Sequence, residues 1–384
     1  MDKITIVFGY RNRETERVKR CLDSLSDQSN KKFKVLFIDY GSNDAAASEM
    51  KELCAKYSFV EYIYSQTQGM PWNRSHALNT GIRKVKTEYT LLSDVDMIYP
   101  PNFIQYLSDK ALPNTQFYKP FYFLPETFAN WNYIFSAKEV NCPDSGTASK
   151  GGLQFVPTKI LHQIRGFDEY YCFWGVEDRD LFHRLEVEGI ETKWMPLEEV
   201  PVFHQWHPVV SNTKKDFFPD RWWDDMNIYF SINRSNSIRN NNNWGQCLSI
   251  DDRPCIKNYS NENYSECINI PSRNDSYYKA ELIDKIIATL LKLKPNESLC
   301  INYQNKNLVT RNNTIKFANN IAQLLVKNFG VVYKSELKYI EHPEKFFIAD
   351  KDVLYVIWKL IKNNNLVQDY YIDVNKEKTT ILLS

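Results

Sequence analysis

Two aspartates separated by one residue follow an apolar run that is typical of a β-strand. The run covers residues 89–92, and Asp94 and Asp96 come just after it. Neighbouring side chains on a strand point to opposite faces, so these two carboxylates would share a face if the strand continued through them. Carboxylate oxygens suit Mg²⁺ or Mn²⁺, ions that also bind substrate phosphates. A solvated acidic turn would have the same sequence, so the context of the motif decides between the two.

A pair of histidines occurs much later, in residues 203–208. His204 and His207 are three residues apart, a spacing that allows both imidazoles to reach one metal ion. Imidazole favours Mn²⁺ over Mg²⁺. A histidine pair by itself is more often structural. Together with the aspartate motif, it predicts His207 as a metal ligand and makes His204 a second candidate.

Acidic residues also open a helix-like segment behind an aromatic loop. Trp174 and Gly175 precede Glu177 and Asp178, and apolar positions follow at helical spacing. The helix dipole stabilises carboxylates at a helix N-terminus, which accounts for their position without any function. It does not account for the Trp-Gly pair beside them. A carboxylate next to an aromatic platform can position and deprotonate a sugar hydroxyl, which indicates general-base chemistry.

The first 93 residues alternate between short apolar runs and amphipathic segments. We expect strands at residues 4–8, 35–38, 60–64 and 89–92, and helices at residues 13–26, 45–56 and 72–85. This alternation predicts an α/β fold with a mainly parallel sheet flanked by helices. Ligands of such sheets bind beyond the carboxyl ends of the strands. The rule would place residues 10–13, 39–44 and 93–97 along one crevice.

A change in composition predicts a domain boundary near residue 250. Residues 231–244 are dominated by Asn, Ser and Arg. Beyond them, helical spacing recurs at residues 282–291 and 321–325, and strand-like runs occur at residues 331–333 and 380–383. We therefore expect a catalytic domain at 1–250 and a smaller α/β module at 251–384. That module could dock a partner enzyme, present an acceptor or associate with a membrane surface.

Bulk properties exclude several classes of protein. The net charge is +1, which argues against a nucleic-acid partner. No window approaches the ~18 apolar residues that a membrane span needs, and the N-terminal residues lack a signal-peptide pattern. The eight cysteines form no CxxC pairs, which argues against a zinc ribbon or a redox motif. We expect a cytoplasmic protein, with peripheral attachment at the inner face of the membrane as an alternative.

Four segments, taken in order, resemble the inverting GT-A glycosyltransferases of family 2 type, particularly the β1,4-galactosyltransferase-like group and bacterial chondroitin-polymerase-type enzymes. The segments are residues 9–13, 72–79, 93–97 and 151–178, the last running from a glycine pair to the Trp-Gly-Val-Glu-Asp motif. The resemblance covers about residues 3–210. It implies a Rossmann-like domain that binds a UDP-sugar donor, a Mn²⁺ or Mg²⁺ cofactor, and an oligosaccharide or lipid-linked glycan as acceptor.

The resemblance also implies a donor site made of nine residues. They are Tyr10, Arg11 and Arg13 beside the uridine and ribose, Asp39 beside the uracil or ribose, Arg74 near the diphosphate, Asp94 and Val95 at the nucleotide or donor sugar, and Gly151 and Gly152 where the donor sugar comes close. Two departures concern this site. Ser149 and Lys150 replace bulky aromatic residues, which leaves space for a 2-acetamido group. A hexose or an N-acetylhexosamine donor therefore fits the resemblance.

The remaining implied roles concern the metal, the acceptor and the reaction. Asp96 and His207 would hold the metal, while His204 falls where animal galactosyltransferases have Met, so the coordination shell would differ. In the catalytic segment, Trp174 would stack on the acceptor sugar, Glu177 would bind its hydroxyls, and Asp178 would be the base. The disulfide framework and the membrane anchor of the animal enzymes are missing from this sequence.

Together these observations predict a metal-dependent, inverting glycosyltransferase similar to galactosyl- or N-acetylgalactosaminyltransferases, acting in bacterial surface polysaccharide (capsule or lipopolysaccharide) synthesis. A metal-dependent nucleotidyltransferase would need a Gly/Lys-rich phosphate loop after the first strand, where residues 10–13 instead follow the single Gly9. A non-catalytic protein that binds nucleotide-sugar or glycan is the other alternative. The presence of every expected acid and metal ligand disfavours it.

Overall fold

We describe a computed structural model of the 384-residue chain. The structure describes residues 2–67, 71–136, 151–208, 222–246, 264–270, 284–294, 297–304, 317, 321, 370–374 and 378–383. The chain divides into two compact units, the first made of Met1–Lys215 and Arg221–Asp252, the second of Asp216–Asp220 and Arg253–Ser384. That the expected domains at 1–250 and 251–384 are separate functional parts stays a prediction.

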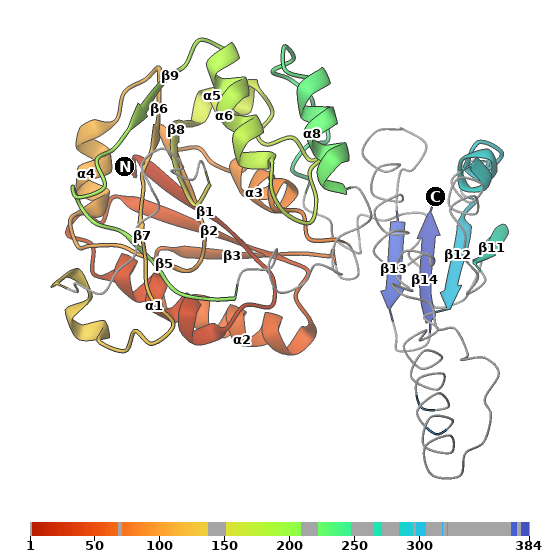
Figure 1. The fold of residues 1–384 in the computed structure, drawn as a ribbon, viewed down its shortest axis with the longest axis horizontal. Coiled ribbons are helices and arrows are strands. Elements are labelled where there is room, and N and C mark those ends of the chain that lie inside the picture. Colours follow the sequence, from red (N-terminus) through yellow and green to blue (C-terminus); the bar gives the residue numbers. More distant parts are fainter. Residues whose placement is uncertain are drawn as a thin grey trace, which may run out of the picture. The chain divides into compact units, whose positions relative to one another are not determined.

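A seven-stranded sheet forms the centre of the first unit (Figure 1), in the order β3-β2-β1-β4-β8-β6-β9. Its strands are β1 Ile4–Tyr10, β2 Phe33–Tyr40, β3 Val60–Ser65, β4 Tyr89–Ser93, β6 Thr115–Tyr118, β8 Leu153–Pro157 and β9 Glu191–Trp194. Strands β3, β2, β1 and β4 are parallel neighbours, as are β6 and β9, while β8 is antiparallel to β4 and β6. The predicted α/β fold with a mainly parallel sheet is confirmed.

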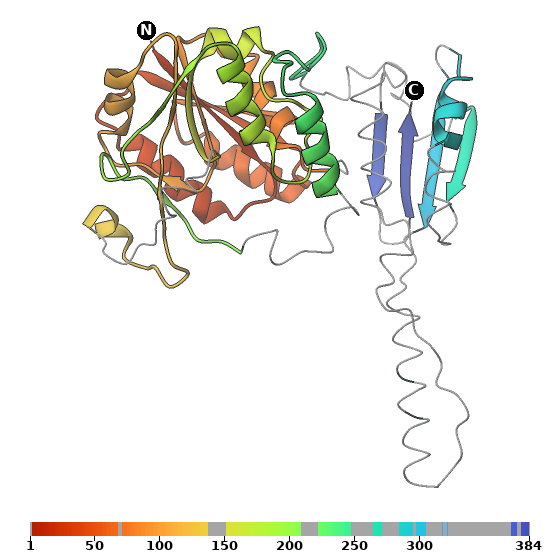
Figure 2. The ribbon, with the colours of Figure 1, turned by 45° about the horizontal axis from the view of Figure 1, so that its top comes forward.

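Helices cover both faces of this sheet (Figure 2). The helices packed on the sheet are α1 Thr15–Ser26, α2 Asp44–Cys54, α3 Arg74–Ile82, α4 Phe103–Lys110, α5 Thr158–Gln163 and α6 Glu177–Val187. The same unit also contains α8 Trp222–Ile232 and a 3₁₀ helix at Trp131–Ser136. Every strand and helix expected in the first 93 residues is present, with ends within three residues of those expected.

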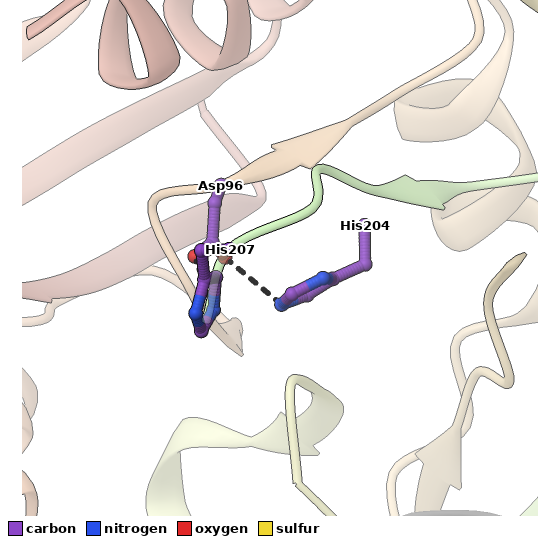
Figure 3. A group of neighbouring side chains, drawn as sticks. All are labelled: Asp96, His204 and His207. Atoms are coloured by element: carbon purple, nitrogen blue, oxygen red, sulfur yellow. Dashed lines mark ion pairs between the residues drawn. The ribbon is translucent and has the colours of Figure 1, made fainter. Parts of the chain in front are cut away.

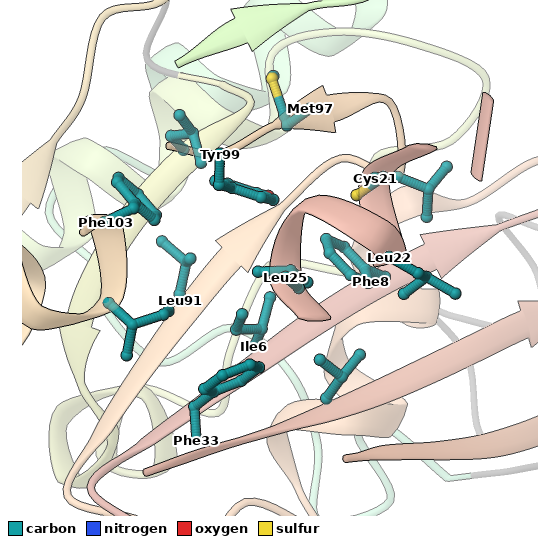
Figure 4. Packing of buried hydrophobic residues seen from close by; sticks show 14 of the residues in the cluster. Ile6, Phe8, Cys21, Leu22, Leu25, Phe33, Leu91, Met97, Tyr99 and Phe103 are labelled. Carbon is teal, nitrogen blue, oxygen red and sulfur yellow. The ribbon is translucent and has the colours of Figure 1, made fainter. Parts of the chain in front are cut away.

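The first strand shows how the sheet holds these layers together. Ile6 and Phe8 pack with Cys21 and Leu22 of α1 on one face (Figure 4), while Val7 packs in a second cluster with residues of α3, α5 and α6 on the other face. Successive strand side chains point to opposite faces, so a continuous apolar run is buried on both sides. The parallel strands β1, β2 and β4 therefore end together at one edge of a rigid core.

A second, three-stranded sheet lies in the same unit, in the order β5-β10-β7. Its strands are β5 Met97–Ile98, β7 Tyr122–Phe123 and β10 Phe203–His204. β10 is antiparallel to β5, with His204 opposite Met97, and parallel to β7. This short sheet joins the turn after β4 to a segment about a hundred residues later in the chain.

The second unit contains a four-stranded sheet in the order β11-β12-β14-β13. Its strands are β11 Glu266–Ile270, β12 Leu299–Gln304, β13 Tyr370–Val374 and β14 Lys378–Leu383, and residues 284–290 are helical. The expected strand at 380–383 lies within β14. The strand expected at 331–333 and all but residue 321 of the helix expected at 321–325 lie outside the described residues. Within the described part of the chain, no helix combines the length and apolarity needed to cross a membrane.

Candidate active site

The two aspartates after β4 have different side-chain partners, Arg74 for Asp94 and the histidines for Asp96, and the strand on which a shared face depended does not continue through them. β4 ends at Ser93, and a turn follows before β5 begins at Met97. The backbone N–H of Asp94 donates to the Gly152 carbonyl at 3.3 Å, and the Asp96 carbonyl accepts from the Gln205 N–H at 2.9 Å. These bonds tie the two residues to different segments, which ends the strand alternation.

Asp96 meets the two histidines (Figure 3). Its Oδ1 lies 3.5 Å from His204 Nε2, and its Oδ2 lies 3.4 Å from His207 Nε2. One ligand atom from each residue lies within 4.8 Å of the others. The pairing of β10 with β5 brings His204 beside the turn that carries Asp96, and His207 follows three residues later. The structure therefore brings together Asp96, His204 and His207, the three residues expected at a metal.

The burial and charge of this cluster fit a divalent cation. The side chain of Asp96 is buried, and its Oδ1, like the Nδ1 of His204, has no hydrogen-bond partner among the described residues. An unpaired buried polar atom costs roughly 1–3 kcal/mol, which an ion would offset. Burial alone would raise the pKa of Asp96, but the facing His204 and His207 hold it well below its usual range. Asp96 is therefore ionised at neutral pH, as an oxygen ligand of a cation must be.

Arg74 connects the turn after β4 to the start of α6. It is the first residue of α3, and the side chain of the preceding Asn73 caps that helix. Its Nε and Nη2 donate to Asp94 Oδ1 at 3.2 and 3.1 Å, and its Nη1 donates to Asp178 Oδ1 at 2.8 Å. One guanidinium thus fixes the positions of two carboxylates that are 84 residues apart in the sequence.

Glu177 and Asp178 open α6 in surroundings that raise their proton affinity. Burial raises the pKa of Asp178, while Arg74 opposes that rise. Burial first, and then the neighbouring Asp178, raise the pKa of Glu177 to about 7. Gln154 Nε2 donates to Asp178 Oδ1 at 3.3 Å. General bases work best with a pKa near the working pH, so these carboxylates suit proton transfer.

The loop before α6 has an unusual backbone that presents Trp174 to solvent. Phe173, Gly175 and Val176 have positive φ angles of 69°, 89° and 74°. Such a conformation is strained for a β-branched residue such as Val176, and backbone strain of this kind clusters at functional sites. The Phe173 N–H donates to the Trp72 carbonyl at 2.7 Å, which anchors the loop. Trp174 remains 46% exposed and lies three residues before the start of α6 at Glu177.

The carboxyl ends of β1 and β2 meet as the crevice rule expects, with Tyr10 opposite Asp39. The Tyr10 ring is buried in the core, and its hydroxyl donates to the Arg13 carbonyl at 3.1 Å. The Asp39 carboxylate is also buried and accepts from the Ser42 N–H and the Tyr62 hydroxyl, both at 2.8 Å. Both side chains are therefore buried and make hydrogen bonds that hold the loops after β1 and β2 in place.

Two arginines of the expected donor site differ in their surroundings. The guanidinium of Arg11 donates to the carbonyl of Tyr40 and, at 2.9 Å, to the carbonyl of Thr67. Arg13 is exposed, and its charge acts on Asp96 and His207. The positions of Arg11 and Arg13 at the strand edge are thus as expected, and their contacts with a donor stay a prediction.

Gly152 occupies a position that only glycine fills. Its φ is +84°, and a Cβ would lie 2.8 Å from Phe121 Cε1 and 2.9 Å from Met97 Cε. The adjacent Gly151 is buried, as is Val95 in the turn after β4. Ser149 and Lys150 lie outside the described residues. The glycine pair thus lets the segment before β8 pack against the turn that carries Asp94 and Asp96.

Sequence reasoning missed several side chains that support the site. They are Gln154 on Asp178, the buried ion network of Asp168, Asp180, Arg184 and Arg239, and Trp223 beside Trp174. Asp180 and Arg184 are four residues apart on α6, but Asp168 and Arg239 lie far from each other in the sequence and form no local motif. Only the Trp222-Trp223 doublet was a visible signal, because two adjacent tryptophans are unusual.

Two family models match the region that carries this site. Residues 5–138 match glycosyl transferase family 2, and residues 133–207 match the N-terminal domain of galactosyltransferase. The structure of GalNAc-T7 with UDP, GalNAc and Mn²⁺ covers 59% of this chain and 50% of that chain, with 14% identity and a TM-score of 0.41. A TM-score of that size is too low to establish a common fold.

Curated relatives match over short stretches. Glycosyltransferase GlyA of Streptococcus pneumoniae is 28% identical over 111 residues, which are 29% of this chain and 15% of the relative. Human chondroitin sulfate synthase 3 is 30% identical over 128 residues, 31% of this chain and 14% of the relative. Teichoic acid poly(glycerol phosphate) polymerase of Staphylococcus epidermidis is 30% identical over 98 residues, 25% and 13% of the two chains. The chain thus spans about a seventh of the length of these relatives.

The two family models together cover residues 5–207, which are 203 of the 384 residues. They adjoin in the order that the motifs predicted, with the aspartate motif in the first and the Trp-Gly-Val-Glu-Asp motif and both histidines in the second. Residues 5–207 therefore match models of glycosyltransferase families, with a family 2 region followed by a galactosyltransferase-type segment.

Proposed function

We propose that this chain is a metal-dependent, inverting glycosyltransferase that moves a hexose or N-acetylhexosamine from a UDP-sugar to a glycan acceptor. The observation that carries the proposal is the double ion pair of Arg74 with Asp94 and Asp178. It joins the turn that holds Asp96 and the metal candidates to the helix that holds the base candidate. A donor at the first and an acceptor at the second would lie side by side.

At the donor side, Asp96 and His207, with His204 beside them, would hold Mn²⁺ or Mg²⁺. The imidazoles favour Mn²⁺. When bound, the ion neutralises negative charge on a leaving diphosphate. The exposed Arg13 adds positive charge near Asp96, and we propose that it contacts the nucleotide together with Arg11.

At the acceptor side, Asp178 would take the proton from the attacking hydroxyl. Arg74 and Gln154 both donate to its Oδ1, which orients Oδ2 as the oxygen that takes the proton. Trp174 would support the apolar face of the acceptor sugar, and Glu177 would bind its hydroxyls. As the new glycosidic bond forms, the bond from the anomeric carbon to UDP breaks on the opposite side. A single displacement of this kind inverts the anomeric configuration.

The choice of donor and the biological role are proposed from the comparisons. The galactosyltransferase model over residues 133–207 favours a galactose or N-acetylgalactosamine donor. The pneumococcal GlyA and the staphylococcal teichoic acid polymerase favour a role in bacterial surface polysaccharide synthesis. For the second unit we propose a role in docking the acceptor, a partner enzyme or a membrane surface. Removing residues 253–384 should then lower activity on the natural glycan more than on a small acceptor.

A panel of UDP-sugars tests the proposed function. UDP-galactose, UDP-N-acetylgalactosamine, UDP-glucose and UDP-N-acetylglucosamine are each incubated with Mn²⁺ or EDTA, and released UDP is measured. We expect Mn²⁺-dependent release from one donor, stimulation by a saccharide acceptor, and a β-linked product from the α-linked donor by NMR. Absence of release from every donor and acceptor would instead indicate a binding protein. A product with retained configuration would contradict the single displacement.

A further inference from the structure

Two half-exposed tryptophans lie side by side next to the acceptor carboxylates. Trp174 precedes α6 and is 46% exposed, while Trp223 on α8 is 47% exposed. Their ring centroids are 6.3 Å apart and their planes differ by 25°. This separation is within the range of aromatic rings in direct contact, so a sugar does not fit between them. The pair instead offers one apolar surface that is longer than a single indole.

The position of Trp223 is fixed by several contacts. The buried Trp222 packs edge-on against it, with centroids 5.4 Å apart. Gly175 makes room for it, because a Cβ there would lie 3.0 Å from Trp223 Cζ3. Arg179 of α6 donates to Asn227 Oδ1 at 2.6 Å, which holds α8 against α6. Trp223 is therefore a built feature of the surface and not a freely moving side chain.

The direction in which this surface extends is set by the rest of the site. Asp96, which meets the histidines, lies in the same turn as Asp94, and Arg74 pairs with both Asp94 and Asp178. Trp174 lies four residues before Asp178, and Trp223 stacks on Trp174, so it extends this series by one further aromatic ring. The side chain of Asp224, next to Trp223 in the first turn of α8, is exposed. An indole suits the apolar face of a sugar, and an exposed carboxylate on the same turn of α8 can accept hydrogen bonds from sugar hydroxyls.

We propose that Trp223 and Asp224 form a second acceptor subsite, which binds the sugar unit next to the one supported by Trp174. The enzyme would then prefer an acceptor of at least two sugars over a monosaccharide. This inference rests on the proposed function and extends it to α8, which lies beyond the residues matched by either family model. It adds a specificity-determining element to a site whose other parts lie within residues 5–207.

The test compares saccharides that share a terminal galactose: methyl β-galactoside, lactose and lacto-N-tetraose, together with chondroitin di- and tetrasaccharides. Binding to wild type, Trp223→Ala and Trp223→Phe is measured by saturation-transfer NMR with UDP and Mn²⁺ present. Trp194→Ala is the matched control, because Trp194 is a similarly exposed tryptophan, 41% exposed, on the edge strand β9. Acceptor-free release of UDP from the preferred donor is measured in parallel.

Wild type should bind an oligosaccharide of one series about tenfold more tightly than the monosaccharide, a difference of about 1.4 kcal/mol. Trp223→Ala should reduce this preference to about twofold or less, Trp223→Phe should retain part of it, and Trp194→Ala should retain it all. The Asp224→Asn variant should weaken the preference less than Trp223→Ala, because it removes only the polar contact. Acceptor-free UDP release should stay unchanged in these variants.

Two results would overturn the subsite: a wild type without any length preference, or a Trp223→Ala variant that keeps it. Loss of acceptor-free UDP release in both Trp223 variants would assign the residue a structural role and also overturn the proposal. Failure of the proposed function would look different. Wild type would release no UDP from any donor while its length-dependent binding disappeared in Trp223→Ala, a result that supports the subsite in a binding protein.

Discussion

The candidate site has two ends: the metal end is the cluster of Asp96, His204 and His207, and the acceptor end is the start of α6 with Glu177 and Asp178. The two ends are held in place by different kinds of interaction. At the metal end, backbone pairing of β5 with β10 and the bond from the Gln205 N–H to the Asp96 carbonyl place the ligands. At the acceptor end, side chains place the carboxylates: Arg74 and Gln154 bind Asp178 directly. Backbone pairing tolerates most changes of side chain. The acceptor end is therefore the part of the site that single substitutions should disturb from a distance.

A buried ion network extends this contrast beyond the site. Arg239 pairs with Asp168 and Asp180, and Arg184 also pairs with Asp180, with every one of these side chains at most 3% exposed. Asp180 and Arg184 lie on α6, whereas Arg239 follows α8 and lies outside both family models. The start of α6 thus depends on residues from a segment that is not shared with those models. At the metal end, by contrast, the candidate ligands lie on or next to the paired strands β5 and β10.

Removing the base should have the largest effect and should be confined to the acceptor end. Asp178→Asn keeps the size of the side chain but cannot accept the proton, so turnover should fall about 10²–10⁴-fold. Binding of UDP and Mn²⁺, measured by calorimetry, should change little. Asp109→Asn, an exposed carboxylate on α4, is the matched control. Near-full turnover in Asp178→Asn would show that another group is the base.

The equivalent change at the metal end should affect binding and turnover together. Asp96→Asn removes the ionised ligand, and metal ions contribute several kcal/mol to such reactions, so kcat/KM should fall about 10³-fold. Affinity for Mn²⁺ should fall as well, which distinguishes this variant from Asp178→Asn. Titration of UDP release with Mn²⁺ measures both effects, and EDTA treatment of wild type should reproduce the loss. An unchanged Mn²⁺ dependence in Asp96→Asn would remove Asp96 from the metal site.

Much of the donor half could be predicted from the sequence because its information is local. Apolar periodicity placed β1 to β4 and α1 to α3, and the parallel-sheet rule placed Tyr10 beside Asp39. The meeting of Asp96 with the histidines followed from ligand chemistry and from the family resemblance. The shared face of Asp94 and Asp96 depended on a strand that continued through both, and the rule of alternation says nothing about where a strand ends.

In the acceptor half, the sequence predicted only the residues of the local motif and not the residues that hold them in place. The Trp-Gly-Val-Glu-Asp sequence identified Trp174 and Asp178, but the partners that hold them lie far away in the chain. Arg239 belongs to a stretch rich in Asn, Ser and Arg, whose composition suggested a region near a boundary, and Trp223 lies just before that stretch. Ion pairs between distant residues leave no periodic pattern, so a single sequence carries no signal for them.

Breaking the ion network should test whether the acceptor end depends on it. Arg239→Met removes the ion-pair partner of the buried Asp168, while Asp180 keeps Arg184, so the free energy of unfolding should fall by about 3–5 kcal/mol. Urea unfolding followed by circular dichroism measures this change. Arg234→Met is the control, because Arg234 is exposed in the same segment. Equal stability of the two variants would mean that the network does not hold α6, and the contrast between the two ends would be lost.

The smallest expected effect is a gain of stability at Glu177. Its pKa of about 7 in the folded protein exceeds the ordinary value of 4.5, so the folded state is favoured while the group is protonated, and this advantage is lost as the pH rises through 7. Glu177→Gln cannot ionise. It should therefore stabilise the protein by about 1–3 kcal/mol at pH 8 and by almost nothing below pH 4.5.

Urea unfolding of wild type and Glu177→Gln at pH 4 and pH 8 measures this difference, with the exposed Glu186→Gln of the same helix as control. A stability difference that does not change with pH would contradict the raised pKa. Glu177→Gln should therefore be more stable than wild type at pH 8 but less active. This result would sharpen the comparison between the metal end and the acceptor end. The acceptor end would then hold an ionised carboxylate at the expense of stability, in the part of the site that depends most on its side-chain contacts.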